Sequence, residues 1–441
     1  MRSPVIAFGI FAATVSPSLI AAAPTSPSLP GAGAVTGSAG TLPAPNANSV
    51  PSVPGAPGGF FHNLIPHPKR ANDAGTAGGN ARTGNTSTAS GGSVVNNADD
   101  TTTLTSDDSN FGGDANDSIS GEATGGDGQG RGPGGNAYTG NSGPARGGSV
   151  ANSAGSVDST DGANTPGSGG TSGTGDAIAG DARRKRALNS QTAGGNAQSG
   201  DSDSSSTGSV FNEGDSDGEI TNNAANDFGT ADDVTAGESY SGDAVGGRGR
   251  NRGPGGNAVS GKAGPSNGGN IGNEAGTIGN TASNAAADGG MSDSGDATGG
   301  DVARRAYDAD TAGGNAHTGD SSNVNGGSVA NVADDDGAIN NADSTFGGIG
   351  GTTTTGDAEG GNSNGRGPGG NASTGNSGNA RGGSVSNSGG DITNTDGSNL
   401  AGDGGDSSTG TATGGNVDGS RVVGNDGTNG FNFGDDVDNG N

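Results

Sequence analysis

Gly313–Ala316 reads G-G-N-A, and the same tetrad recurs at intervals along the 441 residues of the chain. It occurs six times, with its asparagine at Asn80, Asn136, Asn196, Asn257, Asn315 and Asn371. The spacings between successive asparagines are 56, 60, 61, 58 and 56 residues. A degenerate seventh copy, G-G-N-V, is expected to end at Val417. Repetition of this kind indicates a repeat architecture built from one unit many times.

Short apolar residues alternate with polar ones after each tetrad. In one copy, residues 313–319 read G-G-N-A-H-T-G and residues 326–331 read G-G-S-V-A-N. Alternation with a period of two predicts short strands, and the flanking glycines mark turns or close backbone approach. We expect the strands to stack as rungs of a narrow β-solenoid. Asparagines at equivalent rungs are expected to form hydrogen-bonded side-chain stacks, at Asn96, Asn152, Asn212, Asn273, Asn331 and Asn387.

The composition leaves an alternative open, in which the repeats are largely disordered. Glycine supplies 99 residues, aromatic residues make up 3% of the chain, and tryptophan is absent. Such a chain has little apolar bulk with which to offset the conformational entropy lost on ordering, and glycine loses the most. The fold class is therefore a repetitive glycine-rich chain with solenoid-like strands or with little order.

The net charge and the absence of cysteine limit which partners the chain can bind and which kinds of site it can form. The formal net charge is −28, which disfavours binding to nucleic acid or to anionic membranes. The chain has no cysteine, which excludes disulfides and thiolate metal sites. Any order must come from the backbone and from small side chains.

The first 70 residues differ from the repeats. Residues 1–23 combine an early arginine, an apolar run and a cluster of alanines, and are expected to be a signal peptide. Residues 24–70 are rich in Pro, Ala and Ser and are expected to be a disordered leader. No second apolar stretch has membrane length, so we expect no membrane span in the mature protein. The predicted location is secreted, extracellular or associated with the cell wall.

Three basic doublets stand in one register with the repeats. They are Lys69-Arg70, Lys185-Arg186 and Arg304-Arg305. Each ends ten residues before the asparagine of a T-A-G-G-N-A copy and is followed by alanine. Paired bases in an exposed, extended segment of a secreted chain are typical cleavage sites of kexin-type proteases, whose acidic pockets recognise adjacent cations. Cleavage would give repeat units 71–186, 187–305 and 306–441, the last with an acidic tail rich in Gly and Asn.

Residues for catalysis or ligand binding are scarce. His62 and His67 lie in the leader, and His317 stands where other repeats carry Arg82 and Gln198, so no constant imidazole site is present. We therefore predict no enzymatic activity, no cofactor and no dedicated metal site. Oxygen ligands of Asp and Asn suit weak, diffuse calcium binding. Sequons at Asn85, Asn116 and Asn371 are candidate N-glycosylation sites.

The plan of signal peptide, leader and repeats separated by doublets resembles secreted, glycine-rich repeat precursors of fungi that kexin-type proteases process. The resemblance is architectural, and it implies a kexin-type protease as a partner. We expect a non-enzymatic extracellular surface or matrix component that contacts wall or matrix polymers. A secreted effector or multivalent adhesion ligand is one alternative, and a weak calcium-binding β-solenoid is another.

Overall fold

The computed structural model describes residues 75–106, 109–159, 163–183, 191–227, 236–251, 253–303, 311–364, 367–395 and 399–417. The chain divides into two compact units, Met1–Ile65 and Pro66–Asn441, and all described residues belong to the second. The predicted signal peptide and the predicted leader lie outside these ranges. No helix within the described ranges is long and apolar enough to cross a membrane.

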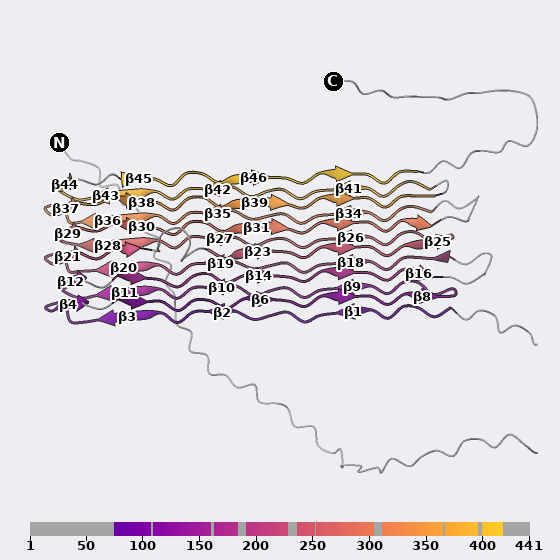
Figure 1. Ribbon diagram of the computed structural model, residues 1–441, viewed down its shortest axis with the longest axis horizontal. Coiled ribbons are helices and arrows are strands. Elements are labelled where there is room, and N and C mark those ends of the chain that lie inside the picture. The colour runs from indigo at the N-terminus through magenta and orange to yellow at the C-terminus, as the bar shows by residue number, and fades with distance from the viewer. Residues whose placement is uncertain are drawn as a thin grey trace, which may run out of the picture. The chain divides into compact units, whose positions relative to one another are not determined.

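The chain runs outward along one layer, turns, and returns along a second layer, once per G-G-N-A repeat (Figure 1). We call each circuit a coil and number the coils 1 to 6, starting at the tetrads of Asn80, Asn136, Asn196, Asn257, Asn315 and Asn371. Corresponding strands of successive coils pair in parallel, and Ala81 of coil 1, for example, pairs with Ala137 of coil 2. One pair of described strands, near the end of coil 3, is antiparallel. These short parallel strands confirm the strand prediction for the described repeats, and their order fits a solenoid.

Three sets of strands form the outward layer. The first is β1 (Ala81–Arg82), β9 (Ala137–Tyr138), β18 (Ala197–Gln198), β26 (Ala258–Val259), β34 (Ala316–His317) and β41 (Ala372–Ser373). The second is β2 (Ala89–Ser90), β10 (Ala145–Arg146), β19 (Ser205–Ser206) and β27 (Ser266–Asn267), with β35 (Val324–Asn325) and β42 (Ala380–Arg381) as a separate pair. The third is β3 (Val94–Asn97), β11 (Val150–Ser153), β20 (Val210–Glu213), β28 (Ile271–Ala275), β36 (Val329–Ala333) and β43 (Val385–Ser388).

The return layer begins after the turn that follows the third set. Its first strands are β4 (Thr103–Ser106), β12 (Ser156–Ser159), β21 (Glu219–Asn222), β29 (Thr277–Asn280), β37 (Ala338–Asn341) and β44 (Asp391–Asn394). Next come β5 (Asn110–Phe111) with β13 (Asn164–Thr165), and β22 (Asn226–Asp227) with β30 (Asn284–Ala285), β38 (Thr345–Phe346) and β45 (Asn399–Leu400).

The rest of the return layer leads back to the start of the next coil. It contains β6 (Ser118–Ile119), β14 (Ser172–Gly173), β23 (Glu238–Tyr240), β31 (Met291–Ser294), β39 (Thr352–Thr355) and β46 (Asp406–Ser408). Beside these lie β7 (Ala123–Thr124), β15 (Ala177–Ile178), β24 (Ala244–Val245), β32 (Ala297–Thr298), β40 (Ala358–Glu359) and β47 (Ala412–Thr413). The last are β8 (Gly128–Gln129) with β16 (Ala182–Arg183), and β25 (Gly249–Asn251) with β33 (Val302–Ala303). Strand β17 (Gln191–Thr192), where the chain enters coil 3, pairs with β25 in the antiparallel direction.

Side chains between the layers form columns along the stack, one residue per coil. One core cluster consists of alanines from both layers, and Ala137, Ala177 and Ala244 are each fully buried. A second cluster contains Ile220, Ile278 and Ile339, each at 0% exposure. Small side chains of constant size allow the two layers to stay close together over the whole length of a coil.

Buried asparagines form three further columns, as predicted for one of them. Each Nδ2 donates to the Oδ1 of the asparagine in the next coil. In the predicted column, Asn96 to Asn387, these bonds measure 2.8–2.9 Å. The other two columns begin at Asn110 and Asn222 and have bonds of 2.8–3.0 Å. Most buried amides of these columns find a partner of their own kind, which lowers the desolvation penalty of the polar interior. The Asn222 Oδ1 and the Asn284 Nδ2, which face Ser159 and Thr345 in the neighbouring coils, are exceptions.

Two series of backbone hydrogen bonds join the layers directly, and we call each a glycine zipper. In the first, the Gly135 amide donates to the Gly126 carbonyl at 2.8 Å, and the Gly180 amide then donates to Gly135 at 2.9 Å. This alternation continues to Gly415 with bonds of 2.8–3.0 Å. A Cβ at Gly135 would overlap the carbonyl oxygen of Gly79. Glycine is therefore required here because the backbones approach closely.

We expected the G-G-N-V sequence at the end of the repeats to be a seventh copy of the tetrad, and this expectation is wrong. Val417 forms a parallel bridge with Ser363 of coil 5, and the Gly360 amide donates to Thr413. The sequence thus belongs to the return layer of coil 6, where other coils have related glycine pairs such as Gly299-Gly300. Both layers contain a glycine pair at the zipper, which is why the two motifs look alike.

Candidate functional site

The predicted processing residues Lys69, Arg70, Lys185, Arg186, Arg304 and Arg305 lie outside the described residues. Their described neighbours all occupy one edge of the stack, which we call the junction edge, where one coil passes into the next (Figure 1). Arg183 ends β16 and Gln191 begins β17 on either side of the second doublet. Coil 1 also enters at this edge, because Thr76 pairs with Gln129. The doublets therefore connect to one edge in alternate coils.

The sheets continue across the boundaries of the predicted repeat units. Coil 2 belongs to unit 71–186 and coil 3 to unit 187–305, yet β11 and β20 pair over four residues. The same holds between coils 4 and 5, where β28 and β36 pair over five residues. A cut at the junction edge would break one covalent connection and leave these sheets in place.

The three sequons lie on the outer surface. Asn85, Asn116 and Asn371 are all exposed. Asn85 and Asn116 are in coil 1 and Asn371 is in coil 6, so they are confined to the two end coils. The Asn85 Oδ1 accepts the backbone amide of Asn141 at 2.9 Å.

Outward-facing Asn and Asp side chains link successive coils along the surface. The Asn80 Oδ1 accepts the backbone amide of Asn136 at 2.8 Å, and this contact repeats up to Asn371 at 2.8–2.9 Å. Each asparagine of the repeated tetrad therefore supports the coil that follows it. The tetrad asparagine was noted in the sequence, but this surface role was not predicted.

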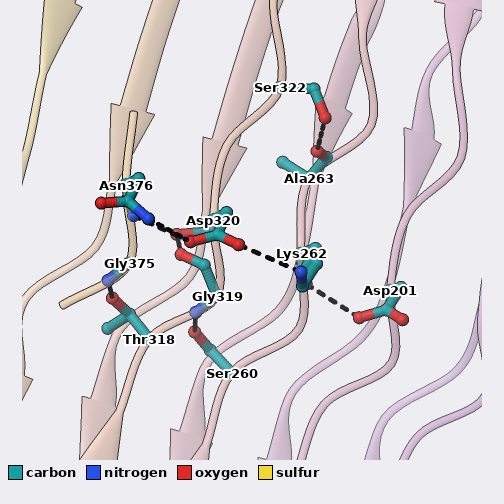
Figure 2. Close-up of polar contacts among 11 residues, drawn as sticks. Asp201, Ser260, Lys262, Ala263, Thr318, Gly319, Asp320, Ser322, Gly375 and Asn376 are labelled. Atoms are coloured by element: carbon teal, nitrogen blue, oxygen red, sulfur yellow. Dashed lines mark hydrogen bonds and ion pairs between the residues drawn. The ribbon is translucent and has the colours of Figure 1, made fainter. Parts of the chain in front are cut away.

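A neighbouring column contains both charges, and Figure 2 shows its central part. The Lys262 Nζ lies 3.0 Å from the Asp320 Oδ2, and the Lys262 backbone amide donates to Asp201 at 2.9 Å. The hydrogen bond to Asp320 raises the pKa of Lys262. The Asp320 pKa is lowered, chiefly because its carboxylate accepts the backbone amide of Asn376. This column therefore also links successive coils through side chains that accept backbone amides, and it adds an ion pair between Lys262 and Asp320.

The return layer carries a column of carboxylates at Asp176, Asp243, Asp296 and Asp357. Each of the first three accepts the backbone amide of the next aspartate at 2.7–3.0 Å. Partial burial raises the pKa of Asp243, and the carboxylates of Asp176 and Asp296 add to the rise. The hydrogen bond from the Thr411 amide lowers the pKa of Asp357.

Asp293 lies beside this column and has a strongly raised pKa. Burial raises its pKa to about 6, and repulsion from Asp296, Asp243 and Glu238 contributes. Nearby Tyr240 covers Gly173 of the preceding coil, and burial followed by the charge of Asp117 raises its pKa. Negative charge is thus concentrated on the return layer around Asp243 and Asp293.

The described residues offer no preformed cluster of metal ligands. No group of three or more His, Asp or Glu side chains within the described ranges is arranged to hold a metal ion. His317 is exposed and shares its outward column with Arg82, Tyr138, Gln198, Val259 and Ser373. Because one carboxylate oxygen in the Asp176 column already accepts a backbone amide, the column provides single oxygen ligands and no preformed cage.

No family of known sequences, no curated protein and no solved structure matches this chain.

Proposed function

We propose that the protein is a secreted, non-enzymatic structural protein whose repeats form a β-solenoid and which serves as a component of an extracellular surface or matrix. The observation that carries the proposal is the distribution of hydrogen bonds. Inward side chains, glycine zippers and outward Asn and Asp columns all join one coil to the next. The side chains and glycines that recur in every coil thus serve mainly to hold the stack together.

Processing by a kexin-type protease is part of this proposal. The alternation of doublet-bearing junctions with R-G-P-G-G-N-A junctions supports cleavage once in every two coils. Because the sheets cross the proposed cuts, the three units remain associated after cleavage. The mature product would then be a nicked stack that keeps its shape, with new chain ends beginning at Ala71, Ala187 and Ala306.

N-terminal sequencing combined with native and denaturing mass measurement tests the processing step. We expect three N-termini under denaturing conditions and a single particle containing all three units under native conditions. The double variant Lys185→Ala with Arg186→Ala should abolish the Ala187 terminus and leave the Ala306 terminus. Arg131→Ala, at a junction without a doublet, is the matched control and should change neither. One uncut chain in every sample would refute processing.

Fractionation of producing cells tests the location. A structural component should be recovered with the insoluble wall or matrix fraction and should be released only by conditions that unfold it or dissolve the polymer. Recovery of all the protein as a freely soluble secreted species would refute the matrix role.

An effector or adhesion ligand is the second candidate, and the outward-facing tetrad asparagines, most of them exposed, favour it. They offer an evenly repeated row of amides, which suits multivalent contact. Saturable binding to foreign cells or glycans, weakened by substituting several of these asparagines, would support that role. Weak calcium binding by the Asp176 column is tested by titration with calcium, and we expect no change in fold.

A further inference from the structure

The first and last coils expose surfaces that are buried everywhere else in the stack. Ile392 of coil 6 is 45% exposed, whereas Ile220, Ile278 and Ile339 in the same column are at 0%. Leu104 occupies that column in coil 1 and is only partly buried. Both end coils therefore have interior chemistry on an unpaired strand edge, a surface that favours pairing with another chain.

The two uncovered ends have complementary hydrogen-bonding groups. The Asn96 Nδ2 donates to Asn152, which leaves the Oδ1 acceptor of Asn96 at the open end of coil 1. The Oδ1 of Asn387 accepts from Asn331, which leaves the Nδ2 donor of Asn387 at the open end of coil 6. A donor at one end and an acceptor at the other permit the column to continue from one copy to the next.

Glycines in coil 1 supply a second, independent observation. A Cβ at Gly79, Gly84 or Gly92 would have nothing within 4 Å. At the equivalent positions of coil 2, a Cβ would overlap a carbonyl oxygen of the preceding coil. Those equivalent positions are Gly135, Gly140 and Gly148. Coil 1 thus has the glycines that a coil needs when another coil lies directly against it.

We propose that copies of this chain stack head to tail, with coil 6 of one copy pairing in parallel with coil 1 of the next. Ala372 would then pair with Ala81, Val385 with Val94, and Ile392 with Leu104, as their columns do within one chain. The contact is heterologous and does not close on itself, so it generates open-ended filaments. In the proposed matrix role, the partner of each chain would then be a second copy of the same chain. The stacking itself is inferred from the end coils alone.

A column in the return layer that has an acidic residue in each end coil opposes the contact and gives it an ionic-strength dependence. The column that contains Asp117 and Thr171 in coils 1 and 2 contains Asp406 in coil 6, so Asp406 would face Asp117 of the next copy. Like charges opposite each other weaken strand pairing, and salt screens the repulsion. Assembly should therefore tighten as salt is raised, and Asp406→Asn should reduce that dependence.

Sedimentation velocity of the full chain over a range of concentrations tests the proposal. The wild-type chain should form particles with masses that are multiples of the single chain. Gly79→Ala combined with Gly92→Ala should keep the wild-type circular dichroism and melting temperature, but should weaken association by tenfold or more because both methyl groups clash with the neighbouring copy. Gly279→Ala, in a middle coil where a Cβ meets only an ordinary contact, is the control and should assemble normally.

Two results would overturn the inference. One is a wild-type chain that stays single at every concentration, and the other is a double variant that assembles as tightly as wild type. A single chain that the two alanines destabilise would identify residues of the same chain as the occupant of the coil 1 edge.

A cross-linking experiment tests the register, since the chain has no cysteine of its own. Ser93 and Ser384 are exposed members of one column in coils 1 and 6. Within one chain they are separated by about 24 Å, at about 4.8 Å for each coil, which is too far for a disulfide. Ser93→Cys with Ser384→Cys should give covalent multimers on oxidation, whereas Ser93→Cys with Ser408→Cys, which are in different columns, should not. Equal cross-linking of both pairs would refute the proposed register.

Failure of this inference and failure of the proposed function give different results. Filaments that form in solution but never enter a matrix fraction would refute the location and leave the stacking intact. Matrix-bound protein that yields only single chains on gentle release, with no multimers from the matched cysteine pair, would refute the stacking and leave the location intact.

Discussion

Inward and outward residues of the same strand have very different variability, although they are neighbours in the sequence. The first position of β1 and its partners is alanine in all six coils. The next position, which faces outward, contains Arg82, Tyr138, Gln198, Val259, His317 and Ser373. The interior position of this strand accepts only a small side chain, whereas the outward position accepts charged, aromatic and β-branched side chains.

The inward-facing residues therefore contribute more to determining the fold than the outward-facing residues do. Two layers joined by backbone hydrogen bonds leave room between them only for small side chains, so the interior repeats from coil to coil. Outer side chains meet solvent and their neighbours along the column, so their identity can drift. Substitutions of the same kind on the two sides should therefore have unequal effects.

The largest effect is expected at a glycine zipper. Gly256→Ala places a Cβ against the carbonyl oxygen of Gly195 in the preceding coil, and the two coils must separate to accept it. We expect a loss of about 3 kcal/mol or more in the free energy of unfolding. Gly279→Ala, in the same coil but on the outer side, should change it by less than about 0.5 kcal/mol. Denaturant unfolding of both variants checks the comparison, and equal midpoints would contradict it.

A buried asparagine should come next. Asn212→Ala removes the acceptor of Asn152 and the donor to Asn273, leaving these buried polar groups without their partners. The expected cost is about 2–3 kcal/mol. The adjacent Phe211 faces outward at 41% exposure, and its column has alanine at Ala151, so Phe211→Ala should cost less than about 1 kcal/mol. Thermal unfolding checks the comparison. A larger loss of stability in Phe211→Ala than in Asn212→Ala would contradict the proposed difference between inward and outward residues.

Completing an interrupted column should stabilise the chain. The column that begins at Asn110 changes to threonine at Thr345, and both the Asn284 Nδ2 and the Thr345 Oγ1 are buried without a hydrogen-bond partner. Thr345→Asn should restore the series, with an expected gain of about 1 kcal/mol. The outward Thr354→Asn is the matched control and should be neutral. A destabilised Thr345→Asn variant would mean that the column cannot be extended at this coil.

The acidic region of the return layer should make a smaller, pH-dependent contribution. Because the folded pKa of Asp293 is about 6 and therefore above its unfolded value, its charge opposes folding at pH 7 and the opposition fades as the pH falls through 6. Asp293→Asn should add about 1 kcal/mol at pH 7, after allowance for its partial exposure, and nothing below about pH 4.

Asp357→Asn provides the matched control for that pH profile, because it removes the same charge from the neighbouring column. The folded pKa of Asp357 is lowered, so ionisation of this residue favours the folded state and its removal should not stabilise at pH 7. If both variants gained stability equally, general repulsion from the net charge would explain the effect and the local burial of Asp293 would not.

The sequence predicted the strands and one asparagine column because both depend on local alternation and a constant register. Asn96 and its partners could be aligned by counting, and the structure places them in one column. The Ile220, Ile278 and Ile339 positions aligned in the same way.

The contacts between layers could not be predicted from the same pattern. Which glycines face each other depends on where the chain turns, and the turns at residues 98–102 and equivalent positions carry no strong signal. Without that pairing, Gly126 and Gly135 look like ordinary turn residues, and G-G-N-V at 414–417 looks like another tetrad. The surface role of Asp176 and its column was missed for a related reason, since single aspartates beside glycine are also typical of a solvated surface.

Hydrogen exchange of the full chain, followed by mass spectrometry of its peptides, tests the central claim most directly. In a stack held together by backbone bonds between layers, the amides of Gly195, Gly256 and Gly314 in the middle coils lie inside a glycine zipper. We predict that the backbone amides of peptides with these glycines exchange far more slowly than those of an unfolded chain of the same sequence. Complete exchange of the middle coils at the unfolded rate would contradict it and would favour a chain whose repeats are disordered.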